Sequence, residues 1–230
     1  MRPDPQRNQP PPAPDAFDFS ASQKGQRSAF IASISFVDRQ LNRRAAALLV
    51  KAVYRTRVTP NQLTWVSAAM GCVSAALFAQ GETLSFVLAG IAAQLSSIID
   101  GADGMLARAR GQCSEFGSHL DLFLDRVVDF SIFAGIALGA SRHFQAPSLL
   151  SLGLLATGLY QLQIILFYLT KSYLKSEERG DTGEARAVLY WAVLIFAVTG
   201  RPDIFIYLLL AETLVLNTFR IGYFVSLGRR

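Results

Sequence analysis

The chain has 230 residues, of which 51% are hydrophobic and only 17% charged, and its mean hydropathy is +0.31. This composition is too apolar for an ordinary soluble domain and indicates a membrane protein. The net charge of +5 comes largely from basic residues at the ends of apolar runs. That pattern is typical of membrane topology and of contact with anionic lipid, so no nucleic-acid partner is expected.

The chain begins with a polar, proline-rich stretch over residues 1–27. It has no apolar core of the kind found in signal peptides, so it is predicted to be a disordered tail. Residues 28–58 differ, because apolar side chains recur there at roughly helical spacing between basic ones. The pattern predicts an amphipathic helix lying on the membrane surface, and an ordinary docking helix without lipid contact fits it as well.

About six candidate membrane spans follow within residues 59–230. They run approximately over residues 61–79, 84–108, 117–141, 148–169, 187–200 and 204–227, and the fifth is short for a bilayer. Thr59 and Pro60 suit the cap and the first turn of the first span. The predicted fold is therefore an all-α polytopic membrane protein with an amphipathic helix before its first span.

Loop charges predict the orientation of these spans. Basic residues concentrate before the first span, between the second and third, between the fourth and fifth, and at the C-terminus, whereas the opposite loops carry only Arg142 and Arg201. By the positive-inside rule, both termini and the end of the second span are expected on the cytoplasmic side of an inner or plasma membrane.

Four aspartates lie beside or inside the second and third spans. Asp100 and Asp103 are three residues apart, and Asp121 and Asp125 are four apart, so each pair shares one face if its segment is helical. Charged groups at membrane depth are costly, and carboxylates that pack together repel unless they are protonated or neutralised. A hard divalent cation is the natural partner for such a group of oxygen ligands.

This stretch resembles the signature of the CDP-alcohol phosphatidyltransferase family, D-x-x-D-G-x-x-A-R followed by G-x-x-x-D-x-x-x-D. Every defined position is filled, by Asp100, Asp103, Gly104, Ala107, Arg108, Gly117, Asp121 and Asp125. The fixed residues at fixed spacing make the resemblance specific, although the motif covers a small part of the chain.

The resemblance implies a two-metal transferase that uses Mg²⁺ or Mn²⁺ and releases CMP from a CDP-linked alcohol. Asp100, Asp103 and Asp121 are expected to hold one ion. Asp100 and Asp121 would bridge to a second ion, together with Asp125, which is also the candidate general base for the acceptor hydroxyl. A metal-bound aspartate has a low proton affinity, so these two roles of Asp125 are in tension.

The resemblance also suggests contacts to the nucleotide and its pyrophosphate. Asn61 in the Thr-Pro-Asn entry of the first span is a candidate nucleotide contact, with a plain helix start as the alternative. Gly104, Ala107 and Gly117 would let the nucleotide lie against the helices. Arg108 suits phosphate oxygens, since a guanidinium group forms paired hydrogen bonds to them. Asp129 is expected to support the cluster from deeper in the third span, paired with Arg126.

The donor and the acceptor remain open. CDP-diacylglycerol and CDP-inositol are the candidate donors, and an alcohol or a polyol phosphate is the candidate acceptor, with homodimers common in the family. Lys171, Arg186 and Arg220 are candidate acceptor-binding residues, and ordinary positive-inside anchors are the alternative interpretation. A divalent-cation transporter is a second class of function for aspartates in spans, and a catalytically silent scaffold is a third.

Overall fold

The computed structural model describes residues 41–173 and 182–227 and contains helices only in this part of the chain. The described helices are α2 (Arg43–Val53), α3 (Pro60–Gln80), α4 (Thr83–Arg110), α5 (Glu115–His143), α6 (Pro147–Tyr173), α7 (Thr182–Val198) and α8 (Pro202–Leu227). The prediction of an all-α fold is confirmed. The predicted tail, residues 1–27, lies outside the described residues, as do residues 28–40 of the predicted surface helix.

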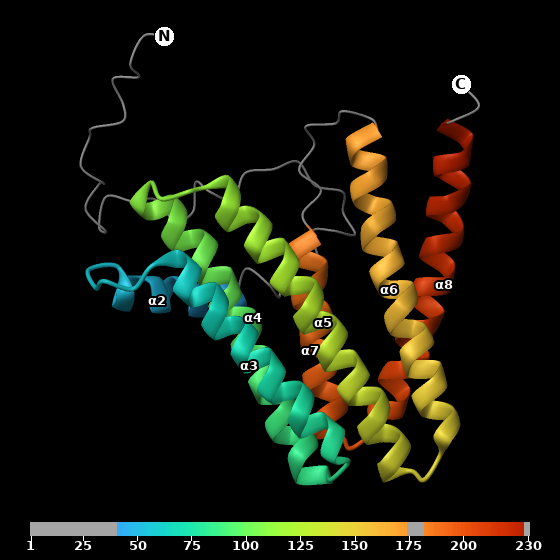
Figure 1. The fold of residues 1–230 in the computed structure, drawn as a ribbon. Helices are drawn as coiled ribbons and strands as arrows, with labels where there is room; N and C mark the ends of the chain where they lie inside the picture. Colours follow the sequence, from blue (N-terminus) through green and yellow to red (C-terminus); the bar gives the residue numbers. More distant parts are fainter. Residues whose placement is uncertain (1–40, 174–181, 228–230) are drawn as a thin grey trace.

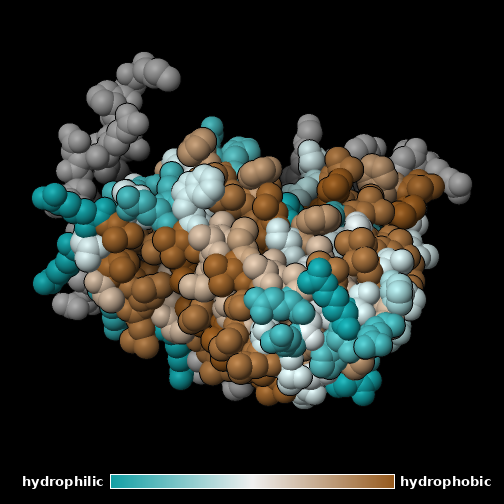
Figure 2. Space-filling view, turned by 60° about the horizontal axis from the view of Figure 1, so that its bottom comes forward, coloured by the Kyte–Doolittle hydropathy of each residue, from teal (hydrophilic) through white to brown (hydrophobic). Residues whose placement is uncertain are grey.

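The six long helices alternate in direction (Figure 1). α3 packs against α4 and α5, α4 packs against α7, and α6 packs against α5 and α8. Four of them, α3, α4, α6 and α8, are long and apolar enough to cross a membrane, whereas α7 is shorter and α5 carries too many charged residues to meet the same criterion. Hydrophobic side chains cover much of the face in Figure 2, and hydrophilic ones gather in patches.

Helix ends follow the local sequence. Thr59 caps α3 as predicted, since its hydroxyl accepts from the Gln62 amide at 3.3 Å while the Gln62 side chain accepts from the Thr59 amide at 2.9 Å. This reciprocal capping box satisfies two backbone donors at the start of the helix. Gly111 ends α4 with a φ of +64°, a left-handed conformation that favours glycine. The turn therefore starts three residues after the signature arginine, Arg108, and leads into α5 at Glu115.

α3 and α5 approach each other closely because small residues line their contact. A Cβ atom on Gly135 would lie 2.5 Å from the carbonyl oxygen of Ala75, and one on Gly139 would overlap the carbonyl oxygen of Phe78. Small residues of this kind let helix backbones pack closely in membranes. On the same stretch of α5, Ile132, Phe133 and Ile136 are almost fully buried and form part of the apolar core.

α2 lies across the long axes of α3 and α4 (Figure 1). It buries Ala46 and Val50 against α4 while Arg44, Leu48 and Lys51 stay exposed. A helix with one buried apolar face and basic residues on the outside is amphipathic, and its place at a membrane surface stays a prediction. The described part of this segment thus has the predicted amphipathic helix.

Candidate metal and active site

α3 fixes the acidic pair of α4. Asp103 is buried, and its Oδ2 atom accepts a 2.5 Å hydrogen bond from the Thr64 hydroxyl in the second turn of α3. Asp100, one turn earlier on the same face of α4, is half-buried. The first turns of α3 therefore do more than start a helix, because Thr64 orients a signature aspartate.

α5 brings the third carboxylate to the same place. α4 and α5 both pack against α3, and ligand oxygens of Asp100, Asp103 and Asp121 lie within 4.8 Å of one another. The Oδ1 atom of Asp121 is buried and has no hydrogen-bond partner. An all-oxygen set suits Mg²⁺ or Mn²⁺, and a buried acceptor without a donor is what a cation ligand would present, so these residues fit a divalent ion.

Asp125, the fourth predicted ligand, has a different neighbour. Its Oδ1 atom accepts a 2.5 Å hydrogen bond from Nη1 of Arg186, and the same Nη1 donates to Oδ2 of Asp100 at 2.8 Å. Asp125 is therefore next to the cluster but tied to a cation from α7. Spacing along α5 predicted which face Asp125 occupies, and it gave no sign of this partner.

Asp129 is the buried hub beneath the cluster. It pairs with Arg126 at 3.0 Å, as predicted, and its other oxygen accepts from Nε of Arg186 at 3.0 Å. The hydroxyl of Tyr190 donates to it at 2.8 Å, and that of Tyr160 lies 3.4 Å away. Sequence reasoning missed both tyrosines, since an aromatic residue in an apolar helix gives no signal that it faces a carboxylate.

The small residues of the signature face polar side chains. A Cβ atom on Gly104 would lie 3.3 Å from Nη1 of Arg108, so the guanidinium of Arg108 folds back over this glycine. A Cβ atom on Gly117 would lie 3.2 Å from Oδ1 of Asn61, so the starts of α3 and α5 adjoin. Ala107 is half-buried on the turn after Gly104. The structure thus juxtaposes Asn61 with Gly117 and Arg108 with Gly104.

The three expected acceptor residues differ in position. Arg186 lies among the aspartates, whereas Arg220 donates to the Gln163 carbonyl at 2.9 Å and stacks over Phe167 on α6. The side chain of Lys171 lies outside the described part of the chain. An acceptor-binding role for these residues remains a prediction.

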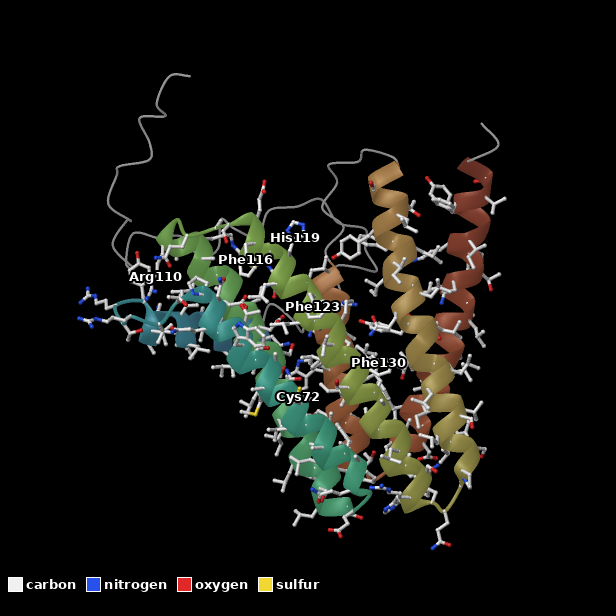
Figure 3. All side chains as sticks on the ribbon, viewed as in Figure 1. Cys72, Arg110, Phe116, His119, Phe123 and Phe130 are labelled. Atoms are coloured by element: carbon white, nitrogen blue, oxygen red, sulfur yellow. The ribbon has the colours of Figure 1, made fainter. Side chains whose placement is uncertain are left out.

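Arg110 is a further residue whose role sequence reasoning missed. Its guanidinium donates to the carbonyls of Val53, Tyr54, Thr56 and Val58, with distances of 2.5 to 3.2 Å. These groups end α2 and form the link into α3, so Arg110 fastens α2 to the end of α4. Figure 3 labels Arg110 in the last turn of α4, and the exposed residues Phe116 and His119 on the first turns of α5.

A family comparison matches this arrangement. The model of the CDP-alcohol phosphatidyltransferase family matches residues 57–219, a region that includes every signature residue and Arg186. The chain belongs to the CDP-alcohol phosphatidyltransferase family. The matched region contains helices α3 to α7 and most of α8.

Several curated proteins are similar to part of the chain. A bifunctional IPC transferase and DIPP synthase of Thermococcus kodakarensis is 45% identical over 102 residues, which are 44% of this chain and 22% of that protein. An archaetidylinositol phosphate synthase of Pyrococcus horikoshii is 37% identical over 97 residues, 42% of this chain and 50% of that protein. A phosphatidylinositol phosphate synthase of Mycobacteroides abscessus is 36% identical over 102 residues, 44% of this chain and 45% of that protein. The chain thus spans about a fifth to a half of the length of these relatives.

Proposed function

We propose that the protein is an integral membrane transferase that moves a substituted phosphate group from a CDP-alcohol to an alcohol acceptor and releases CMP. The observation that carries this proposal is the convergence of Asp100, Asp103 and Asp121 from two helices to within 4.8 Å. These residues are three of the four aspartates to which the signature resemblance assigns metal binding, and all of them lie in the region that the family model matches.

Asp100, Asp103 and Asp121 are the side chains that would hold Mg²⁺ or Mn²⁺, with Asp125 as the fourth ligand. Such ions would neutralise charge on the pyrophosphate and stabilise the leaving CMP. Asn61, Gly117 and the Gly104–Arg108 turn are proposed to receive the nucleotide and its pyrophosphate. Arg108 is exposed and carries the guanidinium nearest to Gly104, so it is free to turn toward phosphate oxygens.

Asp125 is the proposed general base for the acceptor hydroxyl. Its Oδ1 atom is bonded to Arg186, whereas its Oδ2 atom lies 3.9 Å from Arg126, so Oδ2 is the oxygen better placed to take a proton. A carboxylate that acts as a base must lie within hydrogen-bond reach of the acceptor. The proton then moves from the acceptor oxygen to Asp125 as the acceptor attacks phosphorus.

The names of the relatives favour an inositol phosphate as the acceptor. Among the candidate acceptor residues, Arg186 already donates through Nε and both Nη atoms to protein groups. Lys171 and Arg220 are therefore the stronger candidates for an acceptor phosphate. The proposed orientation places the site and both termini on the cytoplasmic side, where CTP-derived donors are made.

The transporter alternative has no support in the fold. A cation path needs polar groups through the full membrane depth. In α5, however, the turn after Asp129 carries Ile132 and Phe133, which are almost fully buried in the apolar core. The polar cluster therefore ends at Asp129, as expected for a site that opens to one side of the membrane.

The test is CMP release by the purified full chain in detergent with Mg²⁺ or Mn²⁺. CDP-diacylglycerol and CDP-inositol are each supplied with inositol phosphate, glycerol phosphate or serine, and the products are identified by mass spectrometry. Wild type is expected to release CMP with at least one pair, and Asp121→Asn and Asp125→Asn are expected to abolish release. Asp203→Asn, the same change in an exposed ion pair with Arg201 at the α7–α8 turn, is the matched control. Full activity of Asp125→Asn would remove its role as base.

A further inference from the structure

Arg186 lies between the first and fourth aspartates of the signature, Asp100 on α4 and Asp125 on α5, which would otherwise face each other. Its Nη1 atom is 2.8 Å from Oδ2 of Asp100 and 2.5 Å from Oδ1 of Asp125. One nitrogen thus bridges an aspartate of α4 and an aspartate of α5. Its positive charge offsets the repulsion between two carboxylates that share a partly buried site.

The guanidinium is held in this position from the buried side. Arg186 is 8% exposed, its Nε donates to the fully buried Asp129, and its Nη2 donates to the Tyr190 hydroxyl at 3.3 Å. That hydroxyl in turn donates to Asp129 at 2.8 Å. Arg186 is therefore a fixed part of the site, unlike the mobile, solvated arginines that usually mark the cytoplasmic ends of spans.

The bridge divides the four signature carboxylates into two groups. Asp103 and Asp121 are not bonded to Arg186, and Asp100 keeps a second oxygen, so these three remain available to one cation. In contrast, both oxygens of Asp125 face a guanidinium group, since Oδ1 accepts from Nη1 of Arg186 and Oδ2 lies 3.9 Å from Arg126. A second ion at Asp100 and Asp125 would have to displace the guanidinium or bind against its charge.

We propose that Arg186 is a resident counter-cation that occupies the Asp100–Asp125 position and weakens binding of a second divalent ion there. In this proposal, Arg186 is a positioning residue that sets the affinity and the number of bound ions while leaving the Asp100–Asp103–Asp121 group available. The inference rests on the proposed function only in taking the aspartates to be cation ligands. It concerns binding of ions in the absence of any donor or acceptor.

The test is a Mn²⁺ titration of the purified full chain in detergent without substrate, in which electron paramagnetic resonance measures free Mn²⁺. Wild type is expected to bind one ion tightly and a second one weakly. In Arg186→Gln, the second ion should bind at least about tenfold more tightly, because a positive charge in contact with both ligands is gone. Asp125→Asn should remove the weaker ion in both backgrounds, which assigns it to this carboxylate.

Arg126→Gln is the matched control. Arg126 pairs with Asp129 at 3.0 Å and lies 3.9 Å from Asp125. Arg126→Gln therefore removes the same charge close to the site while Arg186 stays in its bridge. Its effect on the weaker ion should be clearly smaller than that of Arg186→Gln. The inference would be overturned if the second ion bound Arg186→Gln with unchanged or lower affinity, or if both variants had an equal effect on that affinity. Absence of any Mn²⁺ binding by wild type would instead overturn the metal-dependent part of the proposed function as well.

A second measurement on the wild-type chain covers the case that Arg186→Gln does not fold. Hydrogen exchange of α7 is followed as Mn²⁺ is raised through the range of the weaker ion. Displacement of Arg186 from its bridge should loosen the first described turns of α7, so their exchange should speed up only in that range. Exchange that stays constant, or that slows, would contradict displacement. Arg186→Lys, which keeps the charge but lacks the fork, is expected to bind the second ion with intermediate affinity.

Discussion

Thr64 of α3 donates a 2.5 Å hydrogen bond to Oδ2 of Asp103 on α4, and thereby ties the first span to the signature. Such a bond fixes the direction in which the carboxylate presents its other oxygen. Since Asp103 is buried, few other donors could take the place of the Thr64 hydroxyl if it were removed. The orientation of a proposed metal ligand therefore depends on a residue outside the signature.

Thr64→Val, which keeps the side-chain shape and removes the hydroxyl, is expected to lower Mn²⁺ affinity and the rate of CMP release by about 10- to 100-fold, the usual effect of losing a partner of a metal ligand. Thr64→Ser keeps the hydroxyl and should remain close to wild type. Both quantities are measured on detergent-purified protein. Equal activity of the valine and serine variants would show that this hydrogen bond does not orient Asp103 for function.

Asp129 is expected to matter for stability because it is fully buried and binds two arginines and two tyrosine hydroxyls. Asp129→Asn removes the nearest negative partner of Arg126 and one of the three carboxylates that hold Arg186, and breaking a buried ion pair costs about 3–5 kcal/mol. Thermal unfolding in detergent should show a large drop in midpoint, and Asp203→Asn in the exposed pair with Arg201 should show little change. Similar midpoints for the two variants would contradict the role of Asp129 as a hub.

The sequence predicted the helices and the aspartate group well because both depend on local periodicity. The spacing of Asp100 and Asp103, and of Asp121 and Asp125, fixes which helix face each occupies once the segments are helical. Hydropathy located the helices, although α7 begins at Thr182 and ends at Val198 while the predicted span covered residues 187–200. The earlier C-terminal end follows from the turn at Gly200, whose φ is +67°.

Contacts between distant segments were beyond the reach of that reasoning. Arg186 meets Asp125 across 61 residues, and Arg110 meets Tyr54 across 56. An arginine at the cytoplasmic end of a span is expected for topology alone, so its position along the chain does not distinguish an anchor from a counter-ion. Only the packing of α7 against α4, and of α2 against α4, decides between them.

Replacement of glycine by alanine is predicted to have opposite effects at Gly135 and Gly158, because Gly135 lies in the close contact between α3 and α5 and Gly158 does not. Gly135→Ala places a Cβ 2.5 Å from the Ala75 carbonyl oxygen, and such overpacking costs about 1–3 kcal/mol. Gly158→Ala meets nothing within 4 Å on α6, so the higher helix propensity of alanine should leave it neutral or more stable by up to about 1 kcal/mol. Thermal unfolding midpoints in the same detergent compare the two. A midpoint for Gly135→Ala at or above that of wild type would mean that α3 and α5 can move apart to accept the Cβ atom without loss of stability.

The Arg110 clamp predicts local opening at the join between α2 and α3. Arg110→Ala removes the donor shared by the carbonyls of Val53, Tyr54, Thr56 and Val58. Because hydrogen bonds to a charged group are each worth about 1.5–3 kcal/mol, amide exchange in residues 53–58 should speed up strongly while exchange in α6 and α8 stays unchanged. Asn61 and Thr64 follow directly on α3, so CMP release should fall as well. Arg57→Ala, an exposed arginine in the same link, is the control and should alter neither quantity. If Arg110→Ala matched it in exchange, the buried apolar face of α2 and the hydrogen bond from Gln94 to Asn42 would be sufficient to hold this helix.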